Sequence, residues 1–188
     1  LDATLIPDFG QTAFDDQVLN LGPFEQRYEE KRSFFTEGTE LFSKGGLFYS
    51  RRIGNTPVSY DVVEENLGVN EEIIENPSKV NMLNALKLSG RTEKGLGIGI
   101  FNAITEKTSA TIKNSITDEI RSEVTEPLAN YNVLVLDQQF NKNSSISLIN
   151  TNVLRNGSFR DANATALLFD ISDRGNKYNA TGNLKMSS

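Results

Sequence analysis

Cysteine and histidine are both absent from this chain of 188 residues. No disulfide framework, thiolate zinc site or Cys/His nucleophilic pair can therefore be built. Any catalysis would have to use carboxylates, hydroxyls, lysine, arginine or tyrosine. An oxygen-ligand cation such as Ca²⁺ remains compatible with the composition, and no organic cofactor is expected.

The chain also lacks a long apolar run and a basic stripe. Without eighteen consecutive apolar residues a transmembrane helix is excluded, whereas a transmembrane strand needs only about ten alternating residues. The formal charge of −6 and the pI near 4.8 exclude nucleic acid as an expected partner, because phosphates are neutralised by clustered lysine and arginine.

The length of the chain and the residues at its two ends favour the interpretation that it is one region of a larger protein. A chain of 188 residues suits a single ordinary domain. It opens on Leu-Asp-Ala-Thr, in what looks like the interior of a strand, and closes without a terminating signal. We expect residues 1–188 to form one β-rich region that is a fragment of a larger barrel.

Residues 23–54 are the densest part of the chain in charge, aromatic rings and glycine. A proline followed by an acid, with Lys31 and Arg32 at the end, predicts a short helix over residues 23–32. Residues 47–53 are predicted as a strand. The acidic stretch 61–77 is predicted as a loop or an edge strand.

The second half alternates in a way that is typical of strands. Residues 95–104 place leucine and isoleucine on one face and three glycines on the other, which indicates tight curvature or a crowded interior. Residues 1–6 also read as a strand, and segments 132–140 with 145–154, and 165–171 with 178–186, read as hairpins. Antiparallel strands are therefore expected over residues 87–188.

The last strand leaves two architectures open. Residues 178–186 have one face without charge and one fully polar face. In a soluble β-sandwich the apolar face is the core, whereas in an outer-membrane barrel it meets lipid. Periodicity alone does not separate the two.

Five sequence blocks carry a family resemblance. They are LIPDFGQ (5–11), VLNLGPFEQRYEEKRSFFTEGTELF (18–42), LFYSRRIG (47–54), KLSGRTEKGLGIGIFNAIT (87–105) and EPLANYNVLVLDQ (126–138). In their order they resemble the DUF5916 family over residues 1–154, and the remainder fits as further β-hairpins. Thr12 and Ala13 depart from the Val-Glu expected there, which removes any role for an acid at that point.

The resemblance implies large secreted proteins, frequent in Bacteroidota, with an N-terminal carbohydrate-binding module similar to family 9 ahead of a β-rich region. That module would lie upstream of this chain, so no sugar role passes to any of its residues. The resemblance also implies a barrel-like region in the outer membrane, with a secreted or periplasmic location as the alternative.

The expected fold is an all-β antiparallel meander, part of an outer-membrane-type β-barrel, with a short helix and residues 23–54 as a charged and aromatic, plug-like insertion. The favoured function is non-enzymatic: a barrel component linked to glycan binding, uptake or secretion. Its expected partners are outer-membrane lipid, an outer-membrane protein or a glycan. The alternatives are a carbohydrate-active hydrolase and a soluble β-sandwich binding domain.

The hydrolase alternative depends on paired carboxylates in residues 25–40, because two acids that face a cleft can hydrolyse a glycoside. The candidates are Glu25, Glu29, Glu37 and Glu40. Acids that alternate with bases usually neutralise one another, so salt bridges within the segment are the favoured interpretation.

Ligand and metal candidates complete the set. Phe35, Tyr49, Arg51 and Arg52 are the candidate ligand-binding residues, although paired aromatics are more often core anchors or interfacial girdle residues. Asp8, Asp15 and Asp16 are the candidate Ca²⁺ ligands, but they lack the regular spacing of a calcium loop.

Overall fold

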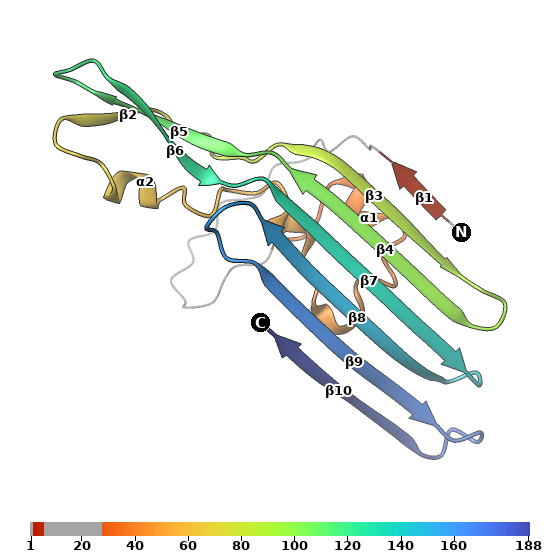
Figure 1. The fold of residues 1–188 in the computed structure, drawn as a ribbon. Coiled ribbons are helices and arrows are strands. Elements are labelled where there is room, and N and C mark those ends of the chain that lie inside the picture. Colours follow the sequence, from red (N-terminus) through yellow and green to blue (C-terminus); the bar gives the residue numbers. More distant parts are fainter. Residues whose placement is uncertain (1, 6–27) are drawn as a thin grey trace.

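The computed structural model describes residues 2–5 and 28–188, which form two antiparallel sheets (Figure 1). The larger sheet has seven strands in the order β1-β3-β4-β7-β8-β9-β10. These are β1 (Asp2–Leu5), β3 (Met82–Arg91), β4 (Leu96–Thr105), β7 (Ala129–Phe140), β8 (Ser144–Arg155), β9 (Ala162–Ser172) and β10 (Asn179–Ser187). The smaller sheet has the order β2-β5-β6, with β2 (Glu71–Glu75), β5 (Thr108–Asn114) and β6 (Ile120–Glu126).

The larger sheet is a meander. From β3 onward each strand pairs antiparallel with the next strand of the sheet, and the chain leaves it once, between β4 and β7, to form β5 and β6. The prediction of an all-β antiparallel fold is therefore confirmed. Within the described residues the sheet is open, with β1 and β10 at its edges, and no closed barrel is present.

The alternating segments coincide with strands. Segments 1–6, 95–104, 132–140, 145–154, 165–171 and 178–186 match β1, β4, β7, β8, β9 and β10 within a few residues at each end. The acidic stretch 61–77 contains a short helix, α2 (Val62–Glu65), and the edge strand β2.

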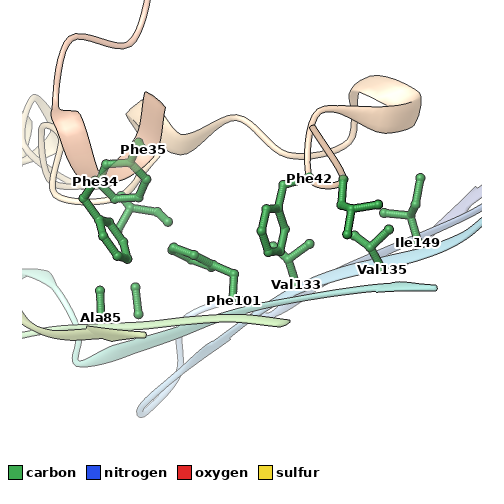
Figure 2. Close-up of a cluster of buried hydrophobic side chains, with 11 residues drawn as sticks. Phe34, Phe35, Phe42, Ala85, Phe101, Val133, Val135 and Ile149 are labelled. Carbon is green, nitrogen blue, oxygen red and sulfur yellow. The ribbon is translucent and has the colours of Figure 1, made fainter. Parts of the chain in front are cut away.

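Residues 28–54, called the docked segment from here on, lie across one face of the larger sheet (Figure 1). Figure 2 shows Phe34, Phe35 and Phe42 pointing from this segment onto the sheet, where Phe101 of β4 points back toward them. The Phe101 ring centroid lies 6.0 Å from that of Phe34 and 5.0 Å from that of Phe48. Packing of aromatic rings therefore fixes the docked segment on the sheet.

The predicted helix over residues 23–32 is wrong for the part that the structure describes. Residues 28–32 are irregular, and the helix α1 (Ser33–Thr36) begins only after them. The physical reason is local: the Glu30 carboxylate accepts the backbone N–H groups of Lys31 and Arg32, at 3.2 and 3.0 Å. Such side-chain-to-backbone bonds compete with the helical pattern.

The predicted strand over residues 47–53 is also wrong. This part contains the 3₁₀ turn η2 (Ser50–Arg52) and follows another, η1 (Lys44–Gly46). The Arg32 guanidinium binds the carbonyls of Ser50 and Ile53, at 2.9 and 2.8 Å. These two carbonyls therefore accept hydrogen bonds from the buried Arg32 side chain and do not pair with a neighbouring strand.

The face of the larger sheet under the docked segment, called the inner face, carries the glycines of β4. A Cβ atom at Gly97 would lie 3.0 Å from Leu41 Cδ2, and one at Gly99 would lie 3.1 Å from Phe42 Cε1. The glycines thus let the docked segment approach the backbone, and the prediction of a crowded interior is confirmed.

The opposite face, called the outer face, is apolar. The large hydrophobic side chains that strands β3, β4, β7, β8, β9 and β10 expose there are Leu86, Ile98, Ile100, Leu134, Leu136, Ile146, Leu148, Leu154, Leu167, Phe169, Ile171, Leu184 and Met186. By the strand register, no charged residue of these six strands lies on this face. The charged residues, including Lys87, Asp137 and Lys185, lie on the inner face.

A row of amides crosses the outer face near one end. This asparagine band consists of Asn102, Asn130, Asn132, Asn150, Asn152 and Asn163. Asn102 Nδ2 donates to Asn132 Oδ1 at 2.8 Å, and Asn132 Nδ2 donates to Asn152 Oδ1 at 3.1 Å. The side chains of four strands are therefore joined by hydrogen bonds along a polar, uncharged border of the apolar face.

The smaller sheet projects beyond this border as an arm (Figure 1). Its small core contains Val63, Ala110 and Ile112, and its surface carries many charged side chains. Hydrogen bonds from the Arg121 guanidinium and the Gly68 N–H outweigh slight burial and lower the pKa of Glu71 to about 2. The surface of the arm thus combines ion pairs with exposed apolar side chains such as Val69 and Ile116.

Candidate functional site

The candidate acids do not form a described catalytic pair. Glu25 lies outside the described residues, and Glu29, Glu37 and Glu40 are exposed. The backbone carbonyls of these three residues accept hydrogen bonds: that of Glu29 from Arg51, that of Glu37 from Lys87 and that of Glu40 from Ser43. The hydrolase assignment therefore stays a prediction that no described contact supports.

Phe35 is a core residue, which corrects its candidacy as a ligand-binding residue. Only 5% of it is exposed, and its ring meets that of Phe34 edge-on at 5.0 Å. The Arg32 guanidinium carbon lies 4.1 Å from the Phe35 ring centroid on another side. No face of the ring is left for a sugar, because aromatic and cationic neighbours occupy it.

The other candidate ligand residues lie at the end of the docked segment. The Tyr49 hydroxyl accepts the backbone N–H of Tyr28 at 3.0 Å, and Arg51 donates to the Glu29 carbonyl at 2.6 and 2.9 Å. Tyr49 and Arg52 line a cavity on the inner face. The metal candidates Asp8, Asp15 and Asp16 lie outside the described residues. Residues 2–5 and 28–188 hold no group of three or more acids that could bind a metal ion.

The sequence did not single out Asp137, which the structure places at the centre of a buried polar cluster. Its side chain has no exposed surface, and Lys44 Nζ, Arg91 and Ser147 all donate to its carboxylate, Lys44 at 2.5 Å and Ser147 at 2.6 Å. Burial alone would raise the pKa of Asp137, but these three donors outweigh it and hold the pKa below its usual range. Asp137 therefore stays ionised and fixes Lys44 of the docked segment to β3, β7 and β8.

Two further cations fix the docked segment through backbone carbonyls. Lys87 of β3 is buried and donates to the carbonyls of Phe34 and Glu37. Arg32 binds the Glu30 carboxylate at 2.8 Å besides the two carbonyls already described. Burial opposes ionisation of Glu30, yet hydrogen bonds from Arg32 and Ser50 lower its pKa. Within the docked segment Arg32 and Glu30 thus form an ion pair, as the alternation of signs predicted, whereas Lys44 pairs with Asp137 of the sheet.

A cavity of about 530 Å³, called the inner cavity, lies between residues 47–58 and the inner face of β7, β8 and β9. Glu126, only 3% exposed, lies in its wall and accepts the Val58 N–H at 2.8 Å. Burial raises the pKa of Glu126, more than the Val58 N–H and the charge of Arg155 lower it. Arg155 Nε lies 4.0 Å from the Glu126 carboxylate.

The burial of Asp137 could have been predicted from the sequence. Asp137 lies two residues after Val135 and four after Val133 on the same strand, so the three side chains point to the same face. Val133 and Val135 are buried there. An acid in such a position needs a partner. Nothing in the spacing identified Lys44, which lies 93 residues away along the chain.

No helix among the described residues is long and apolar enough to cross a membrane. No curated protein and no solved structure matches the chain. The model of one family, described as a domain of unknown function (DUF5916), matches residues 1–188. The chain therefore belongs to the DUF5916 family, as the sequence blocks over residues 1–154 predicted, and the match extends to residue 188.

Proposed function

We propose that this protein is a non-enzymatic component of an outer membrane, and that its larger sheet is part of a β-barrel wall. In this proposal the outer face of the sheet contacts lipid. The docked segment lies inside the barrel as a plug, and the arm stands in water.

The observation that carries the proposal is the separation of charge between the two faces. Six strands of the larger sheet keep every charge on the inner face and place leucine, isoleucine, phenylalanine and methionine on the outer face. A charged side chain at the lipid face of a barrel costs about 2–4 kcal/mol at mid-membrane, whereas the lumen tolerates charge. A soluble sheet normally shows the reverse, with its charged face in solvent.

Strand length and loop length agree with this arrangement. The strands β4, β8 and β10 have 10, 12 and 9 residues. A tilted transmembrane strand needs about 9–11 residues. Three hairpin turns lie at one end of the sheet, and the arm and the short β8–β9 connection lie at the other (Figure 1). Barrels of outer membranes have the same asymmetry of short turns and long connections.

The asparagine band marks where the lipid-facing part of the proposed wall would end. It lies between the apolar outer face and the charged arm, where an uncharged polar border would meet the lipid headgroups. Its amides bind one another, so few donors would be left unsatisfied at the edge of the hydrocarbon.

The absence of cysteine makes a direct test practical, because single cysteines can be introduced for labelling. Leu184 and Asn183 are neighbours on β10 that point to the outer and inner face, and both are exposed. A fluorophore on Leu184→Cys, and on Leu148→Cys in β8, which lies between β7 and β9, should be quenched by lipids with spin-labelled acyl chains. The matched variant Asn183→Cys should be quenched far less.

The same experiment separates the proposal from a soluble β-sandwich. A sandwich would cover Leu148 with a second protein layer, and lipid quenchers would leave all three positions unaffected. Equal quenching at Leu184 and Asn183, or none at Leu148, would contradict the proposed wall. No described observation favours the hydrolase, because the candidate acids that the structure describes, Glu29, Glu37 and Glu40, are exposed and do not line the described cavity.

A further inference from the structure

We infer that the inner cavity is a binding site for a compact organic anion, in which a carboxylate or phosphate is attached to an apolar or aromatic body. The inference concerns the inner face alone and does not depend on what covers the outer face.

The residues that line the inner cavity change from apolar to charged along β7 and β8. Going along β7 and β8, the cavity is lined by the facing pairs Val133–Thr151 and Tyr131–Val153, and then by Arg155, which faces Ala129. The docked segment adds Leu47 and Phe48 on the other side. A ligand in this cavity would thus meet apolar and aromatic surface at one end and charge at the other.

Among the described residues that line the cavity, cations outnumber acids. Three are arginines, Arg52, Arg155 and Arg160, and one is an acid, Glu126. The chain as a whole carries a net charge of −6, so this local excess of cations runs against the average surface. Guanidinium groups recognise carboxylate and phosphate through parallel N–H donors, which identifies the chemistry of the ligand.

Neighbouring groups satisfy the Arg155 guanidinium only in part. One terminal nitrogen donates to the Arg160 carbonyl at 2.7 Å, while Nε has no hydrogen-bond partner among the described residues. The Glu126 carboxylate, 4.0 Å from Nε, lies at ion-pair distance but beyond hydrogen-bond distance. Because Nε itself is shielded from solvent, an anion in the cavity would contact the 18% of the Arg155 side chain that stays exposed.

The volume sets the size of the ligand. About 530 Å³ lies within the range of about 300–1,000 Å³ that is usual for small-molecule sites. One aromatic ring with an acidic group fits this space, with the ring beside Phe48 and Tyr131 and the acid beside Arg155.

The test compares benzoate and phenyl phosphate with benzamide, which has the same ring and no charge, by isothermal titration calorimetry on the purified protein. We expect at least one anion to bind about tenfold more tightly than benzamide, because a hydrogen bond to a charged group is worth about 1.5–3 kcal/mol. Arg155→Gln should remove this preference and Arg155→Lys should restore part of it. Glu126→Gln should strengthen anion binding, since the competing carboxylate is removed.

Arg174→Gln is the matched control, because Arg174 is exposed in the β9–β10 turn and does not line the cavity. It should bind like the wild type. Equal affinity for benzoate, phenyl phosphate and benzamide would overturn the inference without any variant, and so would a lack of saturable binding by both anions. An unchanged preference in Arg155→Gln would overturn it as well.

Discussion

Asp137, Lys44 and Arg91 come from β7, the docked segment and β3, and they meet inside the molecule. The acid is fully buried, whereas the side chains of Lys44 and Arg91 are 29% and 34% exposed. The cluster therefore joins a buried anion to cations that can still reach water. Removal of the Asp137 carboxylate should therefore lower the free energy of unfolding by less than the loss of one partner of a fully buried ion pair, which lowers it by about 3–5 kcal/mol.

The first prediction at this scale concerns Asp137→Asn. The amide keeps the shape of the side chain but removes the charge that three donors share. We expect a loss of about 1–3 kcal/mol in the free energy of unfolding, measured by urea denaturation. Asp170→Asn, an exposed acid on the same face, is the control and should change it little. Equal losses in the two variants would contradict a special role for Asp137.

The pH dependence of that loss has a definite sign. Hydrogen bonds from Lys44, Ser147 and Arg91 hold the pKa of Asp137 low in spite of burial. The contribution of the carboxylate is therefore complete above its unfolded pKa, about 3.9, and is lost as the pH falls from there toward the folded value. The difference in stability between wild type and Asp137→Asn should shrink on acidification below about pH 4. A difference that grows would contradict this.

The sequence predicts that Asp137 points to the inner face, but it does not predict which side chains bind its carboxylate. Alternation along β7 places the acid in phase with Val133 and Val135. Lys44 belongs to a segment without periodicity, so no pattern relates it to β7. Long-range pairs of this kind depend on the docking of the whole segment.

Among the elements, the strands and the docked segment differ in how far the sequence determines them. Period-two alternation predicted β4, β7, β8, β9 and β10, because one face of each strand is apolar along most of its length. In the docked segment, the helix predicted up to residue 32 and the strand predicted over residues 47–53 are wrong. Its conformation depends on tertiary contacts: Phe34 and Phe42 on the sheet, and the carbonyls of Ser50 and Ile53 on Arg32.

The prediction for this element concerns Phe42→Ala. Phe42 is 1% exposed and packs against Gly99 and the Phe101 ring. Removal of a buried phenylalanine costs about 3–5 kcal/mol, and here the loss falls on the docking of residues 28–54. Limited proteolysis should cut within this segment in Phe42→Ala while the circular dichroism signal of the strands persists.

Leu134→Ala is the control for this experiment. It removes a large apolar side chain from the outer face of the same sheet, where Leu134 is 43% exposed. Cleavage of the docked segment should stay as slow as in the wild type. If the two variants are cut alike, the docked segment does not depend on its aromatic anchors.

For the whole molecule, polarity is layered along the strand direction. Hairpin turns lie at one end and the arm at the other (Figure 1). Between them come the apolar part of the outer face and then the asparagine band. The sequence predicted the apolar faces but not which way they point, since alternation is the same in a sandwich and in a barrel. The docked segment covers the face opposite the apolar one, and the glycines of residues 95–104 are the sequence signal that this face is crowded.

If this layering matches a membrane, the two ends of the sheet lie in different compartments, with the arm outside the cell. Ile116 is 72% exposed in the β5–β6 turn of the arm, and Lys142 is exposed in the β7–β8 turn at the opposite end. A membrane-impermeant maleimide should label Ile116→Cys on intact cells. It should label Lys142→Cys only after the outer membrane is permeabilised. Equal labelling of both on intact cells would contradict a sheet that crosses the membrane, and labelling of Lys142→Cys alone would reverse its orientation.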